Sequence, residues 1–106
     1  MKNMLKLIYY VPDSHLAATK QAVFAAGAGA FEDYTDCAWQ VKGIGQFLPR
    51  NTAQPFIGKT DCLEQLEEWR VEMIVPEEKA KQVKQALLQS HPYEVPAFEF
   101  IRLVEV

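Results

Sequence analysis

A weak internal sequence repeat constrains the fold of this chain more than any other sequence feature. A shift of 64 residues places Val11-Pro12-Asp13 on Val75-Pro76-Glu77. The same shift places Ala22-Val23-Phe24 on Ala86-Leu87-Leu88. In each half an apolar segment ends at a proline, which cannot donate to a strand ladder, and an acidic residue then favours a helix start. Two halves of the form strand, helix, strand predict a ferredoxin-like fold.

The hydrophobic pattern predicts four strands and two helices in the order βαββαβ. The first helix follows Pro12, is capped by Asp13 or Ser14, and ends at Gly27, which tolerates a positive φ. Glu77 and Glu78 begin the second helix. Strands are expected over residues 4–11, 36–42, 66–75 and 97–104.

Two of these strands alternate between apolar and polar side chains, which is typical of half-buried strands. In residues 36–42 the apolar face consists of Cys37, Trp39 and Val41. In residues 66–75 one face is apolar, and the other carries Glu68, Arg70 and Glu72. These charges predict either cross-strand ion pairs on a polar sheet face or a salt-bridge network between subunits.

The expected topology leaves one face of the sheet without helices. Right-handed crossovers place the first and third strands in the middle of an antiparallel four-stranded sheet, with two helices on one face. The first strand is apolar on both faces, so either Ile8 and Tyr10 or Leu7 and Tyr9 face outward. Because an exposed apolar face usually marks an interface, we predict a homo-oligomer.

Length and composition bound the class of protein. The 106 residues, 49% of them apolar, predict a single α+β domain over residues 1–106. A net charge of −3 without a basic block argues against nucleic acid, and no apolar run approaches the roughly 20 residues of a membrane span. Lys6 interrupts the N-terminal apolar stretch, and two cysteines at this spacing form no disulfide or zinc framework. We expect a cytoplasmic location.

A series of short motifs resembles one known domain. In chain order they resemble the inserted middle domain of YqfO-type proteins, part of the Ngg-one-interacting-factor-three-like family. The resemblance covers the whole chain, and the His-Pro-Tyr-Glu segment is its most distinctive part. The motifs are Gly27-Ala28-Gly29, Cys37, Gly43-Ile44-Gly45-Gln46-Phe47 with Pro49, Pro55-Phe56-Ile57-Gly58, Arg70-Val71-Glu72 and His91-Pro92-Tyr93-Glu94-Val95-Pro96-Ala97.

This resemblance implies a free-standing version of that domain, with a fold similar to PII and CutA proteins. Such proteins are commonly trimeric, so a trimer is favoured over a dimer. Full-length relatives place a two-metal site in flanking domains, which we expect this chain to lack; its only histidines are His15 and His91. The family's GTP cyclohydrolase-like label is therefore not transferred, and we do not expect an enzyme.

Residues 43–58 are predicted to form a long loop, because glycines and prolines break their periodicity. No P-loop lysine follows the glycines, so a tight turn is favoured over a phosphate cradle. In PII-like proteins the corresponding loop contacts ligands or partners, and Arg50 and Lys59 would meet a small anionic ligand here. The candidate ligand-binding residues are Gly43, Gly45, Phe47, Arg50, Lys59, Glu72 and Tyr93.

His91 and Glu94 are the candidate metal ligands. A histidine and a carboxylate three residues apart could bind a divalent metal ion if a third ligand came from elsewhere or from a second copy. Pro92 and Pro96 favour the alternative, a rigid connection that positions Tyr93 and Glu94. The cofactor is otherwise unknown.

The sequence therefore favours a non-catalytic, homo-oligomeric PII/CutA-like module. It would bind a small ligand, a metal ion or a partner protein through the 43–58 loop and the clefts between subunits. One alternative is a divalent-metal-binding, CutA-like tolerance protein that uses His91 and Glu94. Another is a small hydrolase that uses Glu72 and His91.

Overall fold

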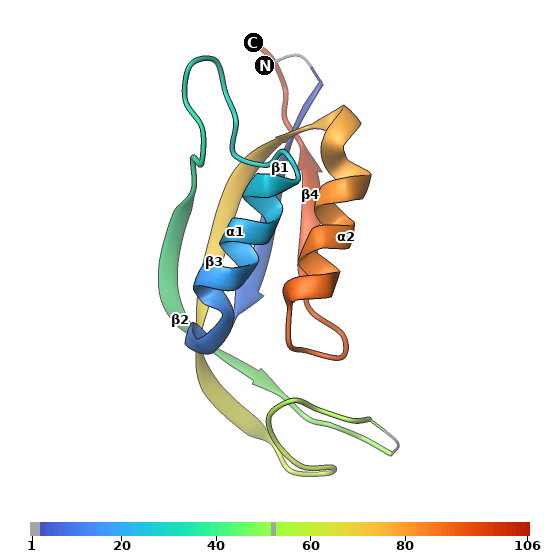
Figure 1. Ribbon diagram of the computed structural model, residues 1–106. Coiled ribbons are helices and arrows are strands. Elements are labelled where there is room, and N and C mark those ends of the chain that lie inside the picture. The colour runs from blue at the N-terminus through green and yellow to red at the C-terminus, as the bar shows by residue number, and fades with distance from the viewer. Residues whose placement is uncertain (1–2, 52) are drawn as a thin grey trace.

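The chain folds as an α+β two-layer sandwich in the expected βαββαβ order (Figure 1). The computed structural model describes residues 3–51 and 53–106. No helix within these residues is long and apolar enough to cross a membrane. The strands are β1 (Met4–Val11), β2 (Trp39–Phe47), β3 (Glu64–Pro76) and β4 (Phe98–Arg102). The helices are α1 (Leu16–Ala25) and α2 (Ala80–Ser90), preceded by the 3-10 turns η1 (Asp13–His15) and η2 (Glu77–Lys79).

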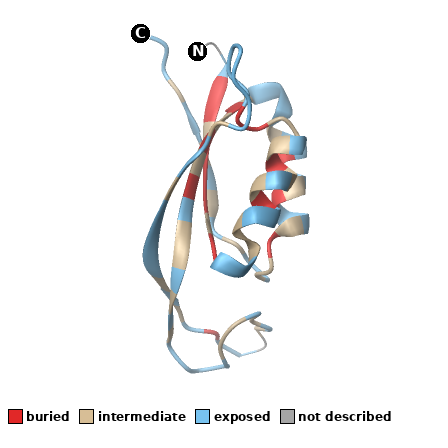
Figure 2. Ribbon diagram, turned by 60° about the vertical axis from the view of Figure 1, so that its left-hand side comes forward, coloured by how far each residue is buried: buried red, intermediate tan, exposed pale blue. Residues whose placement is uncertain are grey.

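The sheet is antiparallel throughout and has the strand order β2-β3-β1-β4. The first and third strands are central, as the crossover rule predicts. Both helices cover the same face of the sheet (Figure 2). The ferredoxin-like prediction is therefore confirmed.

The core lies between this face and the two helices. In β1, Leu7 and Tyr9 are fully buried, and Tyr9 is paired with Val71 of β3. The Tyr9 hydroxyl donates to Thr19 Oγ1 at 2.9 Å, and the Thr19 hydroxyl donates in turn to the carbonyl of His15 at 2.8 Å. Burial raises the pKa of Tyr9 to about 12, so this internal polar chain stays neutral and fully bonded.

The prediction that a loop begins at Gly43 is wrong, because β2 continues to Phe47. Residues 43–47 pair with β3, from Gly43 opposite Glu68 to Phe47 opposite Glu64. A Cβ on Gly43 would meet open space, whereas a Cβ on Gly45 would collide with the Glu68 carboxylate. The connection between β2 and β3 is thus residues 48–63, of which Thr52 lies outside the described residues.

The predicted cap of the first helix is also wrong. Neither Asp13 nor Ser14 caps α1, because both lie in η1 and no side chain caps the helix. Asp13 instead accepts a hydrogen bond from the indole Nε1 of Trp69 at 2.9 Å. The predicted stop at Gly27 agrees with the structure, since α1 ends at Ala25 and Gly27 has a φ of +117°.

The sheet face without helices is mixed rather than uniformly apolar. Ile8 lies on this face but is only 5% exposed. Beside it, Glu72 accepts from Lys6 at 3.4 Å and from Arg70 at 2.8 Å, so these charges pair within one chain. Trp39 and Val41 lie opposite Glu72 and Arg70 and are 58% and 42% exposed. Their expected burial is wrong for a single chain, because no helix covers this face.

Candidate functional site

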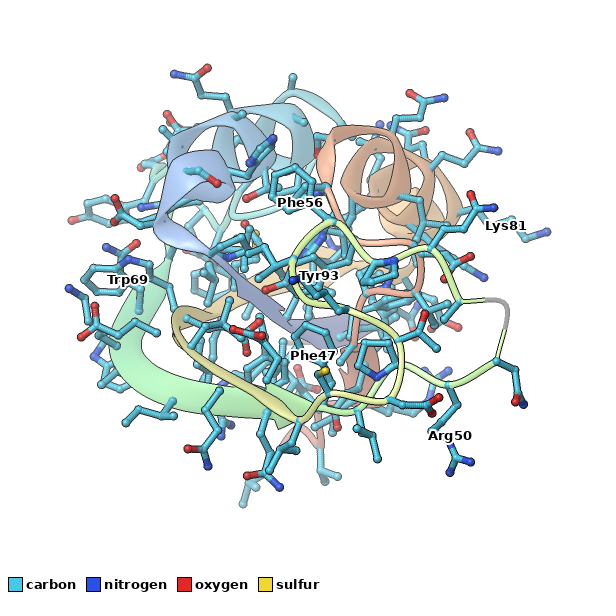
Figure 3. The ribbon with its side chains drawn as sticks, turned by 90° about the horizontal axis from the view of Figure 1, so that it is seen from below. Phe47, Arg50, Phe56, Trp69, Lys81 and Tyr93 are labelled. Atoms are coloured by element: carbon cyan, nitrogen blue, oxygen red, sulfur yellow. The ribbon has the colours of Figure 1, made fainter. Side chains whose placement is uncertain are left out.

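A cavity of about 400 Å³ lies at the end of the sheet, under the connection of residues 48–63. Its walls come from the ends of β1 and β2, from β3, and from the two connections 48–63 and 91–97. Figure 3 looks onto this end and labels three residues that line the cavity, Phe47, Tyr93 and Phe56. The side chains used in the argument below are Tyr10, Phe47, Phe56, Glu68, Tyr93 and Glu94.

Two contacts position the 48–63 connection over this end of the sheet. Strands β2 and β3 continue past the helices, so the connection between them lies beyond the helical layer (Figure 1). The ring of Phe56 meets His15 edge-on at 5.5 Å between centroids. The backbone N–H of Gln54 donates to Glu94 Oε1 at 3.1 Å. The connection is thereby joined to η1 and to the 91–97 segment.

Tyr93 and Glu68 form the polar centre of the cavity wall. The Tyr93 hydroxyl donates to Glu68 Oε2 at 2.6 Å. The Tyr93 ring also contacts Phe47, with 6.2 Å between ring centroids. Burial, followed by the hydrogen bond to Glu68 and its negative charge, raises the pKa of Tyr93 well above its usual value. Tyr93 therefore remains a protonated donor at neutral pH.

His91 holds the backbone of Tyr93 in place through its imidazole ring. Its Nε2 lies 2.6 Å from the carbonyl oxygen of Tyr10 and must donate, because a carbonyl only accepts. Its Nδ1 then accepts from the Tyr93 backbone N–H at 3.2 Å. Burial lowers the pKa of His91, although the Tyr10 hydrogen bond and the charge of Glu68 act in the opposite direction. A neutral imidazole thus joins the end of β1 to the 91–97 connection.

The structure brings four of the candidate ligand-binding residues to this end of the sheet. Gly45, Phe47 and Tyr93 line the cavity. Gly43 and Gly45 line a smaller adjoining cavity of about 280 Å³, which shares Glu68 with the larger one.

The other three candidates lie outside both cavities. Arg50 donates from Nε to Asp61 Oδ1 at 3.0 Å and points away from the aromatic group in Figure 3. Lys59 is exposed and lines neither cavity. Glu72 is held by Lys6 and Arg70 on the open sheet face. The anion site expected from Arg50 and Lys59 therefore gains no support from this geometry.

The candidate metal ligands are engaged in protein hydrogen bonds. Both ring nitrogens of His91 are used, and Glu94 Oε1 accepts from Gln54. Among the described residues, no group of three or more His, Cys, Asp or Glu side chains could hold a metal ion. The metal role stays a prediction, and so does the hydrolase, whose Glu72 and His91 line neither of the two cavities.

Sequence reasoning assigns Tyr10 and Glu68 only to strand faces and so misses both as members of this site. Phe56 belongs to the 43–58 loop that is predicted to contact ligands, although it is not among the named candidate residues. The signal for Glu68 lies in its pairing with Gly43 and its approach to Gly45, which requires the strand register. The approach of Glu68 to Gly45 across two strands cannot be predicted from the spacing of residues along the chain.

Comparison with known proteins places the chain beside one group of relatives. No family model matches it. A GTP cyclohydrolase 1 type 2 homolog from Mycobacterium leprae is 44% identical over 99 residues, which are 93% of this chain and 26% of the relative. The chain thus spans about a quarter of the length of the relatives it matches.

Solved structures agree with this relationship. A Bacillus cereus protein related to NIF3 superposes with a TM-score of 0.83 and 31% identity, over 96% of this chain and 26% of that one. The PII-like protein CutA from Nostoc sp. PCC 7120 superposes with a TM-score of 0.66 and 16% identity, over 93% and 80% of the two chains. The fold is therefore PII/CutA-like, and the resemblance seen in the motifs is confirmed.

Proposed function

We propose that this PII/CutA-like chain, related to a segment of the NIF3-like GTP cyclohydrolase 1 type 2 homologues, is a non-catalytic binding module. The observation that carries the proposal is the cavity of about 400 Å³ that the 48–63 and 91–97 connections line together with the ends of the strands. We assign binding of a small ligand to this cavity. The relatives' activity is not carried over with the name.

The chemistry of the walls supports a binding role. Binding sites are concave and largely apolar, with a few placed polar groups, and have volumes of roughly 300–1,000 Å³. Here the aromatic residues Phe47, Phe56 and Tyr93 line the cavity together with two hydrogen-bonded carboxylates, Glu68 and Glu94. The 48–63 connection is attached by the Gln54–Glu94 hydrogen bond and the His15–Phe56 ring contact. A bound ligand that contacts this connection would add to these few attachments and order it.

Self-association of the open sheet face is the second part of the proposal, and we assign a second copy of the chain to it. The support is the exposed pair Trp39 and Val41 on that face, together with Ile101 at 45% exposure. β2 is also an edge strand, whose outer backbone groups lack a partner strand in the described sheet. A trimer, a single-domain chain and a cytoplasmic location stay predictions.

A fragment screen tests the binding role. Small aromatic fragments are screened against the chain by ligand-observed NMR, and the hits are repeated on Phe56→Ala. The matched control is Phe31→Ala, which removes another exposed phenylalanine outside both cavities. We expect binding to weaken on Phe56→Ala and to persist on Phe31→Ala. A screen without hits, or hits indifferent to Phe56, would contradict the binding role.

A further inference from the structure

The cavity has a one-sided charge. Among the described residues that line it, Glu68 and Glu94 are the charged ones, and none is a lysine, arginine or histidine. Of the cations nearby, Arg50 is paired with Asp61 and points away (Figure 3), and Arg70, which lines the smaller adjoining cavity, is paired with Glu72. An anionic ligand would therefore meet two carboxylates and no compensating charge in this wall.

Neither carboxylate is paired with a cation in the part of the chain that the structure describes. Glu68 Oε2 accepts from the neutral Tyr93 hydroxyl, and Glu94 Oε1 accepts from the neutral backbone N–H of Gln54. The second oxygen of each makes no hydrogen bond with the described residues. Each carboxylate is thus oriented by a neutral donor and has one oxygen without a hydrogen bond to the described residues, which for Glu68 is the Oε1 that lies against Gly45.

The aromatic part of the cavity wall also suits a positively charged ligand. Tyr10, Phe47, Phe56 and Tyr93 contribute aromatic rings. The face of an aromatic ring attracts cations, more strongly where water is excluded, and also accommodates an apolar body. Carboxylates and rings around one cavity combine both sources of attraction.

We propose that the cavity binds a small organic cation, an amine or quaternary ammonium group on an apolar body. Glu68 and Glu94 would receive the positive group, and Phe47 and Phe56 would pack against the body. The inference rests on the proposed binding function of the same cavity and names its ligand class. It replaces the anionic ligand expected from Arg50 and Lys59.

Three probes of similar shape and different charge test the inference: 2-phenylethylamine, 2-phenylethanol and 3-phenylpropionate. Their dissociation constants are measured at neutral pH by protein-observed NMR, which also shows that each variant is folded. We expect the amine to bind about tenfold more tightly than the alcohol, and the propionate to bind most weakly.

Isosteric variants locate the source of the preference. Glu68→Gln and Glu94→Gln each keep a hydrogen-bond acceptor and remove the charge, so each is expected to bring the amine within about threefold of the alcohol. Glu67→Gln makes the same charge change on an exposed neighbour in β3 that lines neither cavity. This control is expected to keep the preference.

The outcomes separate this inference from the proposed function. If the alcohol or the propionate binds as tightly as the amine, the cation class is overturned while the cavity still binds ligands. Equal loss of preference in Glu67→Gln would overturn it as well, because the effect would then come from net charge. If none of the probes binds but the fragment screen succeeds, the cation class alone fails; if both fail, the proposed function falls with it.

Discussion

The hydrogen bond between Tyr93 and Glu68 can be tested on its own. Tyr93→Phe removes the hydroxyl that donates to Glu68 Oε2 at 2.6 Å and keeps the ring that packs on Phe47 and His91. Hydrogen bonds to charged groups contribute about 1.5–3 kcal/mol to stability. Both side chains are half-buried, so water replaces part of the lost bond, and we expect a loss of about 1–1.5 kcal/mol.

A double-mutant cycle isolates the contribution of this hydrogen bond to stability. Wild type, Tyr93→Phe, Glu68→Gln and the double variant are unfolded in urea, and the free energies of unfolding are compared. We expect a coupling energy of about 1 kcal/mol between the two positions. The control is Tyr34→Phe, because Tyr34 is 72% exposed and its loss should cost less than about 0.5 kcal/mol.

Two results would refute this reasoning. One is a coupling energy below about 0.3 kcal/mol, which is within the additivity expected of independent sites. The other is an equal loss of stability in Tyr34→Phe. A spectrophotometric titration adds a further check, since wild type should hold two tyrosines, Tyr9 and Tyr93, that ionise well above the usual pKa, and Tyr93→Phe should hold only one.

Three further predictions follow from the same contacts. Gly45→Ala should lower stability by about 1 kcal/mol in urea unfolding, because its Cβ displaces the Glu68 carboxylate, whereas Gly43→Ala should be neutral. The pKa of His91 in the folded chain lies below its ordinary value of 6.5, so the unfolded chain binds the proton at a higher pH than the folded chain does. The free energy of unfolding should therefore fall as the pH drops below about 6.5. If the slope of the unfolding free energy against pH is unchanged in His91→Gln, His91 is excluded as the cause. Wild type should sediment as a multiple of 12.1 kDa and Trp39→Glu as the monomer; monomeric wild type would exclude self-association.

Much of the fold could be predicted from the sequence because its signals are local. The Pro12 and Pro76 echo locates both strand-to-helix junctions, and the alternation from Trp69 to Val75 gives the two faces of β3. The extension of β2 to Phe47 was not predicted because glycines such as Gly43 and Gly45 are typical of a turn. Gly45 is instead required by the approach of Glu68 from the neighbouring strand, which no local pattern records.

The candidate site could be predicted only in part, for a related reason. Phe47 and Tyr93 lie in motifs with prolines and glycines, which mark them as loop-like and accessible. Tyr10 and Glu68 lie inside regular strands and reach the cavity only because β1 and β3 are neighbours at this end of the sheet. The charge of Arg50 favours it as an anion-binding residue, but in the folded connection this charge is paired with Asp61, and the sequence alone does not predict that ion pair.

The most direct test of the cavity as a binding site is an amide NMR titration of the intact chain. The tightest binder among the screened aromatic fragments and the three phenyl probes is added stepwise, and the positions of the shifted resonances are recorded. We predict saturable shifts at Gly45, Tyr93 and Val95, which line the cavity, and none at Trp39. Shifts confined to Arg50 and Lys59 or to the open sheet face, or an absence of saturable shifts, would contradict the assignment of binding to this cavity.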